Sequence, residues 1–220
     1  GASLLLAWQI RNKRVLLVGG GPVAAGRLTW VLASDALVTL VAPAPLHPEI
    51  HYRVFEDPAT SPSITYHPRK FIDADLDGVD MVLTAIDDVS TSHRICKMAR
   101  AKKIPVNVAD VPPECDFYFG SHYRNGPLQV LVSTGGKGPK LANLIRRRIE
   151  ELLPADLGEA VEKVGKLRTE LRKRAPGHAG GDVSKRRMGW MVRVCDEWSL
   201  EELSTMDDKM IIALLDRGWE

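Results

Sequence analysis

A run of apolar residues that ends in a glycine turn constrains this chain more than any other feature. Residues Arg14–Val18 are apolar after the first, and three glycines follow before Pro22. Spaced as G-x-G-x-x-G/A, the pattern falls on Gly19, Gly21 and Ala24. Proline suits the first position of a helix, where the N–H that it lacks would be unpaired. The stretch therefore predicts the first strand–turn–helix unit of a dinucleotide-binding domain.

The chemistry of this turn suits phosphate groups. Gly19 would make the tight turn, and Gly21 would let a pyrophosphate approach the backbone. Free N–H groups and the helix dipole favour anions at that point. A tight turn that binds no nucleotide stays open as the alternative. The next strand, Leu37–Val41, is followed by Ala42 and Pro43 with neither an acid nor an arginine nearby. The sequence does not separate NAD from NADP here, and backbone groups are expected to contact the ribose.

Composition excludes several classes of protein. The 220 residues carry 30 Lys and Arg against 28 Asp and Glu, which gives no indication of a nucleic-acid partner. No apolar run is long enough to span a membrane. The apolar start, Gly1–Trp8, is expected to pack on the domain rather than act as a signal peptide. Three widely spaced cysteines fit free thiols and a cytoplasmic location.

Alternating strand and helix patterns predict a parallel α/β sheet in the first half of the chain. Residues 43–74 are expected to form an irregular crossover that contains a strand at 64–67, and a helix is expected over Ser90–Lys103 with Ser90 as its N-cap. Further strands are expected at 80–85 and 104–108. Ligands bind at the carboxyl ends of such strands, which places Ala85 and Asp87 over the cofactor.

The pattern changes in the second half. Strands are expected at 117–119 and 128–133, with a hairpin-like turn at 124–126, and helices at 140–153, 157–174, 184–198 and 199–215. The predicted organisation is a Rossmann-like NAD-binding domain over residues 1–112, a small central α+β dimerisation and substrate segment over 113–153, and a helical domain over 154–220.

Five segments in this order resemble the siroheme synthase family, specifically its fungal bifunctional precorrin-2 dehydrogenase/sirohydrochlorin ferrochelatase type. The resemblance covers nearly the whole chain. It rests on Gly19-Gly20-Gly21-x-Val23-Ala24-x-x-Arg27, Asn107–Asp110, Cys115–Gly120, Ser133-Thr134-Gly135-Gly136-x-x-Pro139, and Val164–Arg168 with Leu171-Arg172 and Ala175-Pro176.

The resemblance implies a two-step activity. Precorrin-2 is oxidised to sirohydrochlorin with NAD as hydride acceptor, and Fe(II) is then inserted as a substrate to give siroheme. It also implies a homodimer. The NAD contacts expected from the motif and the strand ends are Gly19, Gly21, Pro22, Val23, Ala42, Pro43, Ala85 and Asp87.

Asp110 is the predicted catalytic residue. It follows a parallel strand, so its carboxylate is expected to face the cofactor crevice. The resemblance assigns this aspartate to both reactions, and both require a group that accepts protons. The alternative is a purely structural role, in which Asp110 caps a turn ahead of Pro112.

The tetrapyrrole substrate carries eight carboxylates, so its site needs cations and N–H donors. The loop before the predicted helix at 140 provides a helix N-terminus of this kind. The resemblance departs at Lys137 and Gly138, where the family usually has hydroxyl residues. The predicted substrate contacts are Asn107, Ser133, Thr134, Gly135, Gly136 and Lys137.

The sequence contains no recognisable set of iron ligands, since its six histidines are scattered. Three interpretations of function therefore stay open. They are the bifunctional enzyme, a precorrin-2 dehydrogenase that does not insert iron, and an NAD-sensing module without catalysis. Asp110 and the predicted anion-binding loop favour an enzyme over a sensor.

Overall fold

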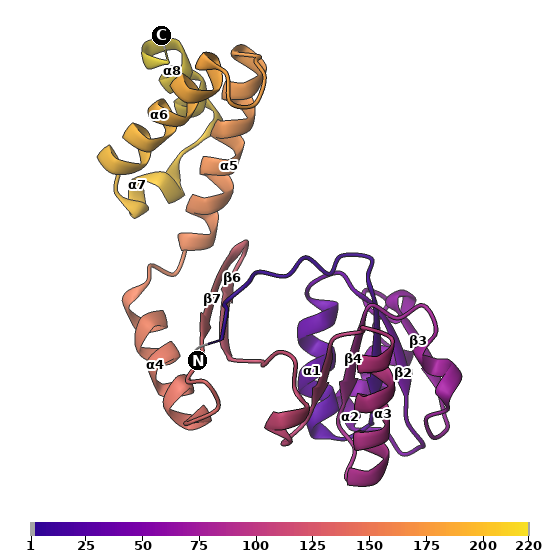
Figure 1. Ribbon diagram of the computed structural model, residues 1–220. Coiled ribbons are helices and arrows are strands. Elements are labelled where there is room, and N and C mark those ends of the chain that lie inside the picture. The colour runs from indigo at the N-terminus through magenta and orange to yellow at the C-terminus, as the bar shows by residue number, and fades with distance from the viewer. Residues whose placement is uncertain (1–2, 220) are drawn as a thin grey trace. The chain divides into compact units, whose positions relative to one another are not determined.

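The computed structural model describes residues 3–219, which form two compact units that meet between Phe119 and Gly120 (Figure 1). The N-terminal unit is a sheet covered by helices. The C-terminal unit begins with a hairpin and continues as helices. The predicted parallel α/β sheet and helical C-terminal region are both confirmed.

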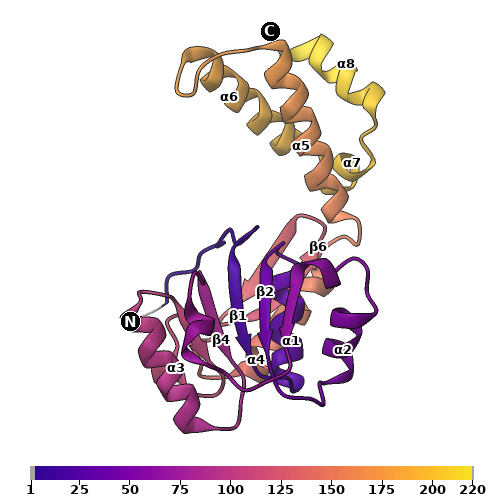
Figure 2. The same cartoon turned by 90° about the vertical axis from the view of Figure 1, so that its right-hand side faces the viewer.

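The sheet of the N-terminal unit has five parallel strands in the order β3-β2-β1-β4-β5. Figure 2 labels three of them, β1, β2 and β4. The residues of β1 after Arg14 and all those of β4 and β5 are buried, which explains the apolar runs in the sequence there. The strands are β1 (Arg14–Val18), β2 (Leu37–Val41), β3 (Ile64–His67), β4 (Met81–Thr84) and β5 (Val106–Val108).

Helices cover both faces of this sheet. Helices α1 (Pro22–Leu32) and α2 (Pro48–Phe55) contribute to one apolar cluster, in which Leu17 and Leu28 are almost completely buried. Helix α3 (Val89–Ala101) contributes to the cluster on the opposite face. Because side chains alternate along a strand, Val106 and Val108 of β5 join the α3 cluster, whereas Asn107 points to the α1 face.

Three local expectations in this unit are wrong. Helix α2 occupies part of the segment expected to be irregular. Helix α3 is capped by Asp88 and not by Ser90, whose hydroxyl donates to the Asp88 carboxylate. Residues 117–119 form no strand, because the Phe117 carbonyl accepts from a side chain and its ring packs on the core.

The C-terminal unit begins with the antiparallel hairpin of β6 (Ser121–Asn125) and β7 (Leu128–Val132). Its turn is formed by residues 126 and 127, so it begins two residues later than expected, and Gly126 has a φ of 54°. The Asn125 amide donates to the Ala155 carbonyl at 2.7 Å and accepts from the Gly158 N–H at 3.2 Å. The helices are α4 (Pro139–Leu152), α5 (Leu157–Arg174), α6 (Asp182–Glu197), α7 (Leu200–Thr205) and α8 (Asp208–Gly218).

The single helix expected over 199–215 is in fact two. Ser199 and Glu202 form a capping box that starts α7. The Asp207 side chain then accepts from the Met210 N–H and starts α8. Both caps interrupt an apolar pattern that reads as continuous, and Leu203, Met206 and Ile211 still share one buried cluster.

The start of the chain packs only in part as expected. Gly1 and Ala2 lie outside the described residues, and Leu4–Leu6 are largely exposed. The Trp8 ring meets the Phe117 ring edge to face at 6.1 Å, and Ile10 is buried. None of the helices between residues 3 and 219 has the length and apolar character needed to cross a membrane. The three-part domain division stays a prediction beside the two units found here.

Candidate functional site: a nucleotide cradle and a fixed aspartate

The glycine turn has the geometry that the fingerprint predicts. Gly19 has a φ of 129°, and a Cβ atom there would lie 2.2 Å from the Ala85 carbonyl oxygen. The turn is tied to the sheet, because the Gly19 N–H donates to the Val41 carbonyl at 3.0 Å. Glycine is thus required at this position, both for the backbone angle and for the approach to Ala85.

Gly20, in the middle of the turn, packs against Leu46 and Ala42. A Cβ atom at Gly20 would meet the Leu46 side chain at 2.9 Å and the Ala42 side chain at 3.1 Å. The Ala42 N–H donates to the His67 carbonyl, and the Ala42 carbonyl accepts from the Tyr66 hydroxyl. Ala42 therefore acts as a buried support of the turn, whereas Pro43 is exposed beside it.

The entrance to α1 is open and has no capping side chain. Gly21 is the N-cap, and no atom comes within 4 Å of a Cβ placed there. Pro22 begins the helix, and its first turn contains no acidic residue. Val23 is 45% exposed next to it. An uncapped helix N-terminus beside open space is suited to a phosphate group, so these residues fit a dinucleotide.

Two neighbouring aspartates, Asp87 and Asp88, follow the end of β4 and have different roles. Asp88 caps α3 by accepting from the Thr91 N–H at 3.0 Å and from the hydroxyls of Thr91 and Ser90 at 2.7 Å. These hydrogen bonds lower the pKa of the Asp88 carboxyl well below its ordinary value. Both aspartates are exposed, but the Asp88 carboxylate caps the helix, whereas Asp87 makes no such cap.

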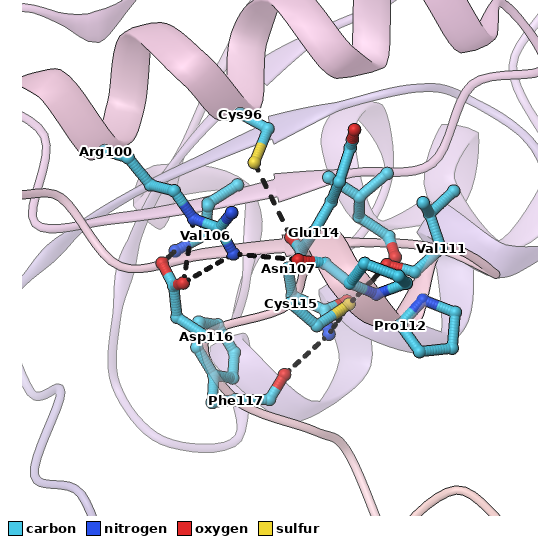
Figure 3. A network of polar contacts seen from close by, with 12 residues as sticks. Cys96, Arg100, Val106, Asn107, Val111, Pro112, Glu114, Cys115, Asp116 and Phe117 are labelled. Carbon is cyan, nitrogen blue, oxygen red and sulfur yellow. Dashed lines mark hydrogen bonds and ion pairs between the residues drawn. The ribbon is translucent and has the colours of Figure 1, made fainter.

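Asp110 is exposed directly after β5, in the left-handed region with a φ of 61°. The segment that follows, residues 111–117, is held by a network of polar contacts (Figure 3). Arg100 pairs with the Asp116 carboxylate at 2.8 Å, and that carboxylate accepts from the Val106 N–H at 3.0 Å. The backbone leaving Asp110 is therefore fixed against β5 and α3.

Two cysteines belong to the same network. The Cys115 thiol donates to the Val108 carbonyl at 3.1 Å, and the Cys96 thiol approaches the Glu114 carbonyl at 3.7 Å (Figure 3). Burial raises the pKa of both thiols. They are accordingly structural groups rather than nucleophiles.

Asn107 lies inside the unit rather than on its surface. It is 3% exposed, and its amide nitrogen donates to the Phe117 carbonyl at 2.8 Å (Figure 3). Its Oδ1 atom and the Thr84 hydroxyl are buried without a hydrogen-bond partner in the described residues. This geometry favours a role in holding the segment after Asp110. Contact with the substrate stays a prediction.

Arg27 also lies in the site, and the sequence analysis did not predict a role for it there. It belongs to the glycine motif, and its guanidinium lies 4.0 Å from the centre of the Phe119 ring. Burial lowers the pKa of Arg27, and the charge of the Asp110 carboxylate acts in the opposite direction. The arginine therefore lies within the electrostatic reach of the predicted catalytic carboxylate.

The predicted substrate loop belongs to the C-terminal unit. The Gly135 N–H donates to the Ser133 hydroxyl and the Gly138 N–H to the Thr134 hydroxyl, both at 3.2 Å. Gly135 and Gly136 have φ values of 60° and 78° with open space around them, and Lys137 is exposed. Helix α4 begins after this loop without a capping side chain.

Two further features lie outside the predicted residues. A cavity of about 420 Å³ lies between α5 and α6, and its lining includes Arg168, Arg172, Met188 and Met191. Among residues 3–219, no group of three His, Cys, Asp or Glu side chains is placed to hold a metal ion.

Three family models match consecutive parts of this chain between residues 6 and 220. Residues 6–121 match the family described as putative NAD(P)-binding. Residues 125–152 match the central part of sirohaem biosynthesis proteins, and residues 154–220 match their C-terminal part. A siroheme biosynthesis protein of Schizosaccharomyces pombe is 52% identical over 98% of this chain and 79% of its own length.

The chain belongs to the siroheme biosynthesis protein family. The siroheme biosynthesis protein of Saccharomyces cerevisiae is 35% identical over 96% of this chain and 89% of its own. The siroheme synthase of Thioalkalivibrio sulfidiphilus is 37% identical over 83% of this chain, which spans only 35% of that relative. A solved structure of SirC, a precorrin-2 dehydrogenase, has the same fold, with a TM-score of 0.69, 19% identity and 98% of each chain covered.

These findings confirm the family expected from the sequence. They also confirm that the chain is an enzyme of siroheme biosynthesis with an NAD(P)-binding domain. The individual site residues stay predictions, and the structure describes where they lie. We call Gly19, Gly21, Pro22 and Val23 the nucleotide cradle. The cradle residues and Asp110 belong to the N-terminal unit, and Ser133–Lys137 belong to the C-terminal unit.

Proposed function

We propose that this chain oxidises precorrin-2 to sirohydrochlorin with NAD and then inserts Fe(II) to give siroheme. The observation that carries the proposal is Asp110, an exposed carboxylate held at the carboxyl end of β5 on the same sheet edge as the nucleotide cradle. Family membership supplies the pathway, and the name of the SirC structure supplies the first reaction.

In the first reaction, precorrin-2 loses a hydride and a proton. The nicotinamide of NAD, when bound, accepts the hydride. The cradle residues Gly19, Gly21, Pro22 and Val23 would hold the pyrophosphate at the start of α1. Asp110 would accept the proton, because a carboxylate at the crevice edge is a suitable general base. The products are sirohydrochlorin, NADH and one proton.

In the second reaction, Fe(II) is a substrate and replaces two protons on the pyrrole nitrogens. The same carboxylate would receive them one after the other. We propose NAD as the hydride acceptor because the family resemblance implies it; the end of β2, with Ala42 and Pro43, does not separate NAD from NADP. We further propose a cytoplasmic homodimer, in which residues 113–153 supply dimerisation and substrate contacts.

The direct test is an anaerobic incubation of the protein with precorrin-2 and NAD, followed by addition of Fe(II). We expect stoichiometric NADH and then siroheme, both faster than without enzyme. NADH without faster iron insertion would leave a dehydrogenase alone. If NADH does not form, the proposal fails, and a non-catalytic NAD-sensing role replaces it.

The Asp110→Asn variant tests the residue. Asparagine tolerates the left-handed backbone, so the variant should fold and bind NAD normally. Removal of a general base is expected to reduce turnover by about 10²–10⁴-fold. Asp35→Asn is the matched control, since Asp35 is also an exposed aspartate with a φ of 58°. Full turnover by Asp110→Asn would sink the assignment.

A further inference from the structure

Arg27 is a cationic side chain next to the proposed active site, and the role argued for it here rests on the proposed function. Helix α1 faces the sheet with Ala24, Leu28 and Val31. Arg27 lies at the edge of this face and is only partly exposed. Its guanidinium lies over the Phe119 ring at 4.0 Å. This contact with the ring restrains the side chain.

Arg27 differs from Arg94, another arginine that lies over a ring, in what balances its charge. Arg94 lies 5.6 Å from the Phe71 ring, and it also pairs with the Asp73 carboxylate at 2.7 Å. Among residues 3–219, the Arg27 side chain makes neither an ion pair nor a hydrogen bond. A partly buried guanidinium that lacks a carboxylate of its own retains its five donors for a ligand.

The surroundings indicate what this ligand is. The Phe119 ring beside Arg27 lies 5.9 Å from the Phe117 ring, and the Phe117 carbonyl accepts from Asn107 of β5. Asp110 follows the end of this strand, and its charge acts on Arg27. Guanidinium groups bind carboxylates through two parallel hydrogen bonds. The proposed substrate carries eight carboxylates around its ring and must bring its reacting atoms to Asp110. A cation held at a fixed place beside the base would orient such a molecule.

We propose that Arg27 binds a peripheral carboxylate of the tetrapyrrole and so positions the macrocycle against Asp110. The guanidinium is a substrate anchor and takes no part in proton transfer. This assigns the final arginine of the glycine motif to the tetrapyrrole, although the preceding residues of that motif serve the nucleotide. One helix would then present its N-terminus to one ligand and its second turn to the other.

The test compares Arg27→Met with Arg94→Met. Methionine keeps an unbranched apolar stem against the phenylalanine ring and removes the charge. We expect Arg27→Met to bind sirohydrochlorin about 10- to 100-fold more weakly, measured by anaerobic absorbance titration without iron or NAD. NADH affinity should stay within about twofold of the wild type. Arg94→Met should match the wild type in both titrations.

Two further measurements separate anchoring from a purely structural role. Arg27→Lys keeps the charge but not the paired donors, so it should recover part of the affinity. In turnover, Arg27→Met should raise the KM for precorrin-2 more than it lowers kcat. Unchanged sirohydrochlorin affinity in Arg27→Met would overturn the inference, and so would a loss of NADH affinity of the same size.

The outcome for the wild type distinguishes this inference from the proposed function. If the wild type forms NADH and binds sirohydrochlorin while Arg27→Met binds equally well, only the role of Arg27 fails. If the wild type forms no NADH and binds no sirohydrochlorin, the proposed function itself fails. Circular dichroism melting of all four proteins identifies a variant that has lost its fold, and Arg27→Lys then carries the comparison.

Discussion

Helices α1 and α4 begin in similar ways, and yet their glycine loops are held by different forces. Each has a proline as its first residue, glycine as its N-cap and no capping side chain. The α1 turn is fixed by the sheet, with Gly19 against Ala85 and Gly20 over Leu46. The α4 loop is held by the hydroxyls of its own Ser133 and Thr134.

The difference teaches that one sequence signal, glycine before a proline that starts a helix, can be held in place in two ways. The α1 entrance is held in place by the sheet, which suits the pyrophosphate expected there. The α4 entrance has open space around Gly135 and Gly136, so its backbone can adjust. The sequence predicts that this loop binds the tetrapyrrole, and an adjustable backbone would suit a substrate that changes between two reactions. Substitutions at equivalent points should therefore have unequal effects.

The largest effect is expected at the first glycine. Gly19→Ala would place a methyl group 2.2 Å from the Ala85 carbonyl oxygen, at a φ of 129°. The fold should lose about 3 kcal/mol or more, with NAD binding lost as well. Gly135→Ala has the left-handed angle without the clash and should cost only about 1 kcal/mol. Urea unfolding measures both, and equal losses would refute the contrast between the two loops.

A second variant separates binding from folding at α1. Gly21→Asp introduces a side chain where no atom lies within 4 Å, and aspartate is a favourable N-cap. The melting temperature should hold or rise, because the new carboxylate caps the free N–H groups. NAD binding should fall below detection, since that carboxylate takes the place of the pyrophosphate and repels it. Isothermal titration with NAD would contradict the nucleotide site if it returned the wild-type Kd.

Helix α3 provides the smallest effect, because its N-terminus already carries a carboxylate. Hydrogen bonds from Thr91 and Ser90 lower the pKa of Asp88, so its stabilising contribution exists above the ordinary carboxyl pKa. That contribution is lost as the pH falls through the lowered value. Asp88→Asn should therefore be slightly less stable than the wild type at pH 7. The difference in melting temperature should shrink below about pH 4, and a gap independent of pH would disprove the cap.

The sequence predicted those elements whose signals are local. Strands β1, β2 and β3 and helix α5 have the bounds expected from apolar runs and periodicity. Helix α2 was missed because only Ile50 among its eight residues is buried, which leaves little apolar pattern. The division between α7 and α8 depends on side-chain caps that an apolar pattern does not reveal.

The sequence predicted the geometry of the glycine turn better than it predicted the contacts around Asp110. Glycine at position 19 follows from backbone geometry that is written in the motif. The contact between Arg100 and Asp116 joins a helix to a loop 16 positions later, and no spacing rule contains it. Asn107 reads as a polar residue for a ligand, whereas the fold uses its amide inside the unit.

The segment after Asp110 is held along α3 by contacts from several turns of that helix, and this limits which insertions and deletions the protein can accept. His93 contacts Glu114, Cys96 approaches the same residue's carbonyl, and Arg100 pairs with Asp116, so successive turns of one helix hold one loop. Inserting a single residue into α3 between His93 and Arg100 would rotate one contact by about 100° relative to another. Side chains here can change one at a time, but the lengths of helix and loop can change only together.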